Sequence, residues 1–292
     1  MQRRQFLTRA TVGVATAAGI LSDGRSAAAQ SPVTEPVHRV AAASLAPATK
    51  SVHPLDTALT VARNTLEMSR QQIVDYEALL VKRETIDGEL GPHEFMNIKV
   101  RNRKVADGRI QTPFSVYLGF LKPAAIKGRE CLYVENANDG NVTAHEGGFK
   151  GRFLPTVCVA PDGMLAMRGQ RYPITEIGLE NLLLKLIERG GRARQNASVQ
   201  CEFRKNARVR DRVCTVIQVT QPTRQAGNEF HTAQVFIDDE IGLPIRYAAF
   251  DYPRGTEAQG QIIEEYTYLN LRTNVGLTDL DFSRDNPAYK FN

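Results

Sequence analysis

The residue types that most often perform chemistry are scattered along this sequence. No two of its 5 histidines stand four residues apart, as a metal-binding pair on a helix would require. Its 4 cysteines form no Cys-x-x-Cys pair, which excludes a zinc ribbon and a thioredoxin-type redox centre. No Gly-x-Ser-x-Gly elbow, phosphate-binding loop or dinucleotide-binding glycine pattern is present. We therefore predict no catalytic residue, no metal ligand and no cofactor.

The cysteines leave the disulfide pattern open. An even number permits two disulfides if the chain is exported. Cys201 and Cys214 face each other only if the turn between them centres on residues 207–208, whereas the better turn residues, Arg210-Asp211, separate them. Buried free thiols are the alternative. The four cysteines concerned are Cys131, Cys158, Cys201 and Cys214.

Acidic side chains form two short clusters, at residues 238–240 and 279–281. Calcium prefers such oxygen ligands, but the spacing fits no EF-hand loop, and turn formation and helix capping are the simpler explanation. Glu264 and Glu265 point to opposite faces of a strand, so they form no obvious acid–base pair. Glu84 lies near a turn, where we expect it to be solvated.

The segment 113–121 carries the strongest apolar signal. Four of its large apolar side chains share one strand face, and Tyr117 lies on the other, so we expect both faces to be covered. Ordinary core packing would do this, and so would a cavity that holds an apolar ligand. Met164 and Met167 also suit such a cavity because methionine adapts to apolar ligands. We predict these ligand-binding residues: Met96, Phe114, Val116, Leu118, Phe120, Leu179, Leu183 and Leu186.

Two helices are expected to position these residues. The apolar spacing of residues 54–73 predicts the first, and the leucines of residues 175–189 predict the second. Thr175 is the expected N-cap of the second helix, and Gly190-Gly191 its end. Leu179, Leu183 and Leu186 would let this helix cover the cavity.

The rest of the chain alternates like a set of strands joined by short turns, which favours antiparallel pairing. About eleven strands are too many for a flat twisted sheet. We predict an α+β fold, a large curled antiparallel sheet or incomplete barrel, with two or more helices on its concave face and one domain over residues 54–292. The expected strands are 76–86, 94–100, 113–121, 130–135, 142–145, 156–160, 164–167, 199–209, 213–220, 230–237, 244–252 and 261–271.

The N-terminus has the layout of an export signal. Arg3-Arg4 precede an apolar run and then Ala27-Ala28-Ala29, which predicts a twin-arginine-type signal peptide over residues 1–29 with cleavage after Ala29. An ordinary secretory signal is the alternative. Residues 30–53 are rich in Ala, Pro, Ser and Thr and should form a flexible linker. We therefore expect a periplasmic or secreted protein without a membrane span in its mature chain.

The signal also explains the charge of the chain. The whole sequence has a formal net charge of +5, but 4 of its 37 basic residues and only 1 of its 32 acidic residues lie in the signal peptide. The mature chain is nearly neutral, which removes the compositional argument for nucleic-acid binding. Its 42% hydrophobic and 24% charged residues are ordinary values for a globular protein.

The order of one helix, a strand meander, a second helix and more meander resembles the periplasmic outer-membrane lipoprotein carrier superfamily. More closely, most of residues 60–292 are similar to an uncharacterised family of secreted bacterial domains of unknown function. The similarity rests on residues 113–121, 127–130, 171–176, 236–240 and 276–282. The carrier resemblance implies a half-open barrel with helices as a lid over an apolar cavity.

That resemblance favours a non-enzymatic periplasmic binding or carrier protein, whose partner is a lipid or an acylated protein. The alternative is a periplasmic sensor or interaction module of an envelope stress or regulatory system, which would bind a periplasmic protein partner. An exported hydrolase has the least support, because no nucleophile–base set is visible. No nucleic-acid partner is expected.

Overall fold

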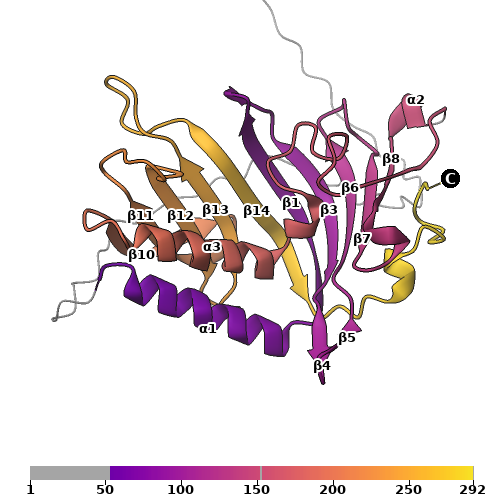
Figure 1. The fold of residues 1–292 in the computed structure, drawn as a ribbon, viewed down its shortest axis with the longest axis horizontal. Helices are drawn as coiled ribbons and strands as arrows, with labels where there is room; N and C mark the ends of the chain where they lie inside the picture. The colour runs from indigo at the N-terminus through magenta and orange to yellow at the C-terminus, as the bar shows by residue number, and fades with distance from the viewer. Residues whose placement is uncertain (1–52, 152, 292) are drawn as a thin grey trace, which may run out of the picture. The chain divides into compact units, whose positions relative to one another are not determined.

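A computed structural model describes residues 53–151 and 153–291. It has the predicted α+β composition, with helices and one wide antiparallel sheet (Figure 1). The helices are α1 (Asp56–Gln72), α2 (Gly148–Gly151) and α3 (Leu179–Ala193), with 3-10 turns at Asn138–Gly140, Ile174–Glu176 and Asp279–Phe282. The strands are β1 (Asp75–Ile86), β2 (Glu89–Leu90), β3 (Glu94–Arg101), β4 (Lys104–Ala106), β5 (Arg109–Thr112), β6 (Ser115–Lys122), β7 (Glu130–Val134), β8 (Val142–His145), β9 (Val157–Val159), β10 (Gln200–Val209), β11 (Arg212–Thr220), β12 (Thr232–Asp238), β13 (Pro244–Phe250) and β14 (Ile262–Thr273).

The sheet is built outward from its two central strands. Eleven strands follow the order β10-β11-β12-β13-β14-β1-β3-β6-β7-β8-β9, with β2 paired to β1 beside this path. The first strand of the chain, β1, therefore pairs with the last, β14, and every pair is antiparallel. Within β1–β9 and within β10–β14 most strands pair with the next strand along the chain, and such direct connections give the antiparallel pairing that the sequence predicted. The curl of so wide a sheet stays a prediction.

The strand prediction is wrong in two places. Residues 164–167 form turns, and Met164 is 92% exposed, so this segment has no strand partner to pair with. Conversely, β4 and β5 form a separate hairpin that was not predicted, around a tight turn in which Asp107 and Gly108 both have positive φ. The Asp-Gly pair is a recognisable hairpin signal, but the strands beside it are too short and polar to stand out.

The second helix is shifted relative to its prediction. Thr175 is not its cap, because residues 174–176 form their own 3-10 turn. The helix begins after Gly178, whose φ of 108° favours glycine, and the Leu179 amide donates to the hydroxyl of Tyr76 in β1 at 2.9 Å. The sheet thus caps this helix, in place of a local side chain.

The helix also runs through Gly190-Gly191 and ends at Ala193, so these glycines are not its end. A Cβ atom at Gly190 would lie 2.8 Å from the Leu59 Cδ2 atom of α1. The glycine is therefore explained by the close contact of α1 and α3, which lie side by side (Figure 1).

The main core lies between α3 and the central strands. Tyr76, Ile98, Val116 and Leu179 are each at most 1% exposed and belong to one apolar cluster. The opposite face of β6 is covered too, because Tyr117 packs there with Leu132, Phe282 and the stacked ring of Tyr289. The expectation that residues 113–121 are covered on both faces is therefore confirmed.

One buried acid, Asp75, holds the C-terminal segment against the face of β6 that carries Tyr117. The carboxylate of Asp75 accepts hydrogen bonds from the backbone amides of Val275, Gly276 and Leu277, at 2.7 to 3.2 Å. In the same segment the Thr278 and Asp281 side chains form a capping box at the start of the 3-10 turn. The acids at 279–281 thus include a helix-capping side chain, as the sequence predicted.

The pairing of β10 with β11 decides whether Cys201 and Cys214 face each other. Val209 lies opposite Arg212, so the turn centres on Arg210-Asp211 as its chemistry favoured. Cys214 then lies opposite Ala207, well away from Cys201. All four cysteines are free thiols.

Candidate functional site

A cavity of about 720 Å³ lies between one face of the sheet and a cover formed by the segment 160–178 and α3. This volume falls within the range of about 300–1,000 Å³ that small-molecule sites occupy. Strands on both sides of β1 contribute to its lining, from β9 to β13. Its apolar lining includes Leu80, Met96, Leu118, Phe120, Val142, Ile174, Leu182 and Leu186.

The predicted ligand-binding residues separate into three groups. Met96, Leu118, Phe120 and Leu186 line the cavity together. Three others lie outside its lining and are almost completely buried in the protein: Val116, Leu179 and Leu183.

Phe114 lines a different cavity of about 460 Å³, between the end of α1, the β4–β5 hairpin and the start of α3. Neither Met164 nor Met167 lines the larger cavity. The binding role of each predicted residue stays a prediction.

Charged side chains form part of the cavity's lining. Lys82 and Glu84 extend the same face of β1 as Leu80, because side chains alternate along a strand. The Lys82 ammonium donates to Gln170 Oε1 at 2.5 Å and lies 3.3 Å from carboxylate oxygens of both Glu84 and Glu94. One buried lysine is thus shared between two acids.

Glu84 was expected to be solvated, and this is wrong. It is only 7% exposed, because β1 continues to Ile86 and the cover packs over it. Its directly opposite neighbour on β14 is Glu264, which is 2% exposed. Two like charges at such a position destabilise a sheet unless cations compensate them.

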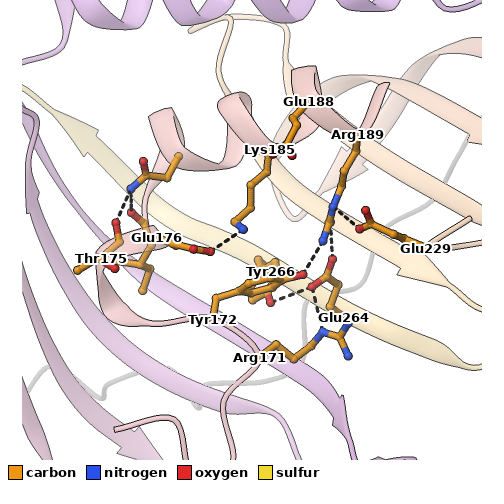
Figure 2. A network of polar contacts seen from close by, with 12 residues as sticks. Arg171, Tyr172, Thr175, Glu176, Lys185, Glu188, Arg189, Glu229, Glu264 and Tyr266 are labelled. Atoms are coloured by element: carbon orange, nitrogen blue, oxygen red, sulfur yellow. Dashed lines mark hydrogen bonds and ion pairs between the residues drawn. The ribbon is translucent and has the colours of Figure 1, made fainter. Parts of the chain in front are cut away.

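The compensation comes from the cover (Figure 2). Arg189 of α3 donates to Glu264 at 2.7 Å, and Arg171 lies 3.4 Å from the same carboxylate. The Tyr266 hydroxyl lies between the two acids, donating to Glu84 at 2.5 Å and 3.3 Å from Glu264. The cluster is thus a largely paired network rather than a set of free charges.

The tyrosines in this network remain protonated. Burial, followed by the nearby charges of Glu264 and Glu84, raises the pKa of Tyr266 well above its ordinary value. Burial and the charge of Glu264 likewise raise the pKa of Tyr172 to about 12. Both hydroxyl groups therefore keep their protons at neutral pH, and neither supplies a phenolate nucleophile.

The same contacts fasten the cover to the sheet. The Arg171 amide donates to Glu84 at 3.2 Å, and its guanidinium donates to the Thr85 carbonyl at 3.0 Å. Tyr172 accepts a hydrogen bond from Arg189 at 2.6 Å and lies under the Lys185 ammonium, 4.3 Å from the ring centre (Figure 2). The segment before α3 is therefore joined to β1, β14 and the helix itself.

Other potentially reactive groups near the cavity are not activated for chemistry. Burial raises the pKa of the Cys131 thiol to about 12, so it stays protonated at neutral pH. Among the described residues, no group of three His, Cys, Asp or Glu side chains is arranged to hold a metal ion. The site combines apolar walls with a neutralised polar cluster, which suits binding of an amphipathic molecule.

Sequence reasoning missed the polar half of the site. Alternation from Leu80 could have placed Lys82 and Glu84 on the inner face, and the same alternation links Glu264 with Tyr266. No local pattern could have identified Arg189 as their partner, since it comes from a helix 75 residues away from Glu264.

The fold and cavity define an α+β domain with a wide antiparallel sheet and a helical cover. The chain belongs to the family described as "Protein of unknown function (DUF1571)", which matches residues 73–291. This confirms the family resemblance expected from the sequence. The sequence comparison finds no match among curated proteins.

Several solved structures are similar at low identity. A putative outer membrane lipoprotein-sorting protein domain from Vibrio parahaemolyticus has 12% identity over 77% of this chain and 95% of its own, with a TM-score of 0.36. The lipoprotein LppX of Mycobacterium tuberculosis has 12% identity over 76% and 98%, with a TM-score of 0.38. MucB, solved in complex with MucA(peri), has 15% identity over 77% and 59%, with a TM-score of 0.40. Likeness at this level does not transfer a ligand.

Proposed function

We propose that this protein is a non-enzymatic carrier or binding protein that holds a lipid or acylated ligand in the 720 Å³ cavity. The observation that carries the proposal is the cavity itself, which joins apolar walls to a buried polar cluster. An acyl chain would lie against Met96, Leu118, Phe120 and Leu186, and a polar head would lie toward the charged lining.

The physical driving force is the removal of the acyl chain from water. Each buried CH₂ group contributes about 0.8 kcal/mol. Eight such groups would supply about 6 kcal/mol, before the cost of ordering the ligand and the cover. The neutralised polar network adds little net charge, so a ligand would be selected mainly by its apolar part.

The location of the protein is part of the proposal. The proposal of export to the periplasm is supported by the twin-arginine-type signal of residues 1–29. This signal, and the linker of residues 30–53 except for its last residue, lie outside the described residues. No helix in the described part of the chain has the length and apolar character needed to span a membrane.

The test is a titration of delipidated protein with a fluorescent fatty acid. Ala144 of β8 is half-buried and lines the cavity, so Ala144→Trp fills space that the ligand needs. Ala106 on the β4–β5 hairpin is exposed and outside the cavity lining, which makes Ala106→Trp a matched control. We expect saturable binding to the wild type and the control, and binding at least about tenfold weaker in Ala144→Trp.

Two results would contradict the proposal. The first is the absence of saturable fatty-acid binding by the wild type. The second is unchanged binding in Ala144→Trp, because the ligand would then occupy another surface. Recovery of a stoichiometric periplasmic protein partner without any lipid would instead support the sensor or interaction module.

A further inference from the structure

Exposed apolar side chains gather in one short part of the chain. Six large apolar residues between positions 149 and 165 are exposed, and the next largest group among the described residues is the pair Val105 and Ile110 on the β4–β5 hairpin. An exposed cluster of this kind marks a surface that contacts another body. We call it the rim patch, and its members are Phe149, Phe153, Leu154, Val157, Met164 and Leu165.

The most prominent members have no core to pack against. Phe149 and Phe153 are 75% and 72% exposed, and their rings contact each other with centroids 5.1 Å apart. Met164 is 92% exposed. Phe149 belongs to α2, which projects past the end of β8 (Figure 1). These side chains remain in water unless a partner covers them.

The rim patch is continuous with the cavity. Leu154, Val157 and Leu165 are exposed to solvent and also line the 720 Å³ cavity. Apolar side chains therefore extend from the outside of the protein into the cavity lining. A ligand with an acyl chain could follow this surface and avoid exposure to water.

The sequence that carries the rim patch has a small excess of basic residues. Between residues 146 and 168 the sequence has three basic and two acidic residues, and Lys127 and Arg129 add two more positive charges. The 127–129 segment lies against this part of the chain, because a Cβ atom at Gly147 would be 2.1 Å from the Gly128 carbonyl carbon. One of the two acids, Glu146, is paired with Arg129 at 2.9 Å.

We propose that the rim patch docks on the surface of an anionic phospholipid bilayer. Exposed Phe, Leu and Met side chains insert at the boundary between headgroups and acyl chains, and the basic side chains are attracted to the anionic headgroups. The inference rests on the proposed function, because docking there places the cavity mouth against the bilayer that supplies or receives the acyl ligand.

A bilayer fits these observations better than a protein partner. Interfaces between proteins combine apolar contacts with directed hydrogen bonds. The exposed tips of the rim patch carry no hydrogen-bonding groups, and the net positive charge around them complements an anionic lipid surface. A second copy of this chain would bring the same positive charge against itself.

The test is co-sedimentation of the mature chain with vesicles of phosphatidylglycerol mixed with phosphatidylcholine, and with vesicles of phosphatidylcholine alone. The variant Phe149→Ser/Phe153→Ser removes both aromatic rings at exposed positions, so the fold should persist. Leu280→Ser is the matched control, because Leu280 is 52% exposed and lies outside the rim patch. We expect the wild type and control to bind the anionic vesicles, and the double variant to bind them at least about tenfold more weakly.

Fatty-acid titration of the same proteins separates this inference from the proposed function. The double variant should bind a soluble fluorescent fatty acid as the wild type does. Failure of fatty-acid binding with intact vesicle binding would overturn the proposed function and leave docking in place.

Docking is overturned if the wild type binds neither vesicle, or if the double variant binds as well as the wild type. It is also overturned if sedimentation velocity shows a wild-type dimer that the double variant loses, since the patch would then be an interface between copies.

Discussion

Replacing Arg189 by methionine tests whether the polar network holds the cover to the sheet. Arg189 is the nearest cation to Glu264, at 2.7 Å, and the Glu264 side chain is 2% exposed. Removing one partner of a buried ion pair costs about 3–5 kcal/mol, because the remaining charge stays in a poor solvent. Arg171 and Tyr266 remain 3.4 and 3.3 Å from Glu264, so we expect the lower end, about 3 kcal/mol.

The assay is urea unfolding followed by circular dichroism. With a denaturant slope of about 2–3 kcal/mol per M, the midpoint should fall by about 1 to 1.5 M in Arg189→Met. In the double variant Arg189→Met/Glu264→Gln no buried charge is left behind. We therefore expect its loss to be about 2 kcal/mol smaller than the sum of the two single losses.

Arg192→Met is the matched control on the same helix. Arg192 is 49% exposed and pairs with Glu188 and Glu229 at the surface, so its loss should cost less than about 1 kcal/mol. If Arg189→Met costs no more than this control, or if the two network substitutions are additive, the buried network does not hold the cover.

Three further predictions concern other parts of the fold. Asp75→Ala removes the acceptor of three backbone amides, and should cost about 2–3 kcal/mol and expose the C-terminal segment to limited proteolysis. Burial raises the pKa of Asp238, but hydrogen bonds from Arg212 and two backbone amides outweigh it and hold the pKa below the ordinary 3.8. Ionised Asp238 therefore stabilises the fold fully above pH 3.8, and this stabilisation is lost as the pH falls below 3.8. In this acid range the free energy of unfolding should fall less for Asp238→Asn than for the wild type. A thiol reagent at neutral pH should label the exposed Cys158 first and the buried Cys214 only after unfolding; a disulfide found by mass spectrometry would refute the free-thiol assignment.

Much of the fold is predictable because it depends on local chemistry. Arg210-Asp211 determines the register of its hairpin, and the leucine spacing identifies the second helix. The limits of that helix are not local, since the Tyr76 hydroxyl caps its start and Leu59 occupies the space beside Gly190. Both contacts come from segments more than 100 residues away in the sequence.

The candidate site also has one part that local patterns predict and another part that depends on contacts between distant segments. Alternation along single strands placed Met96, Leu118 and Phe120 on one surface, and these do line the cavity. It could not separate them from Val116, which lies on the same strand face but is completely buried in the core. The polar network requires the pairing of β1 with β14, in which Glu84 and Glu264 become neighbours across most of the chain length.

The central claim is that the cavity holds an acyl chain, and a chain-length series tests it most directly. Delipidated protein is titrated with saturated fatty acids of increasing length, in competition with a fluorescent fatty acid. Each added CH₂ should strengthen binding about fourfold, corresponding to about 0.8 kcal/mol, until the 720 Å³ cavity is filled and the affinity levels off. Affinity that does not depend on chain length, or no competition at any length, would contradict the account.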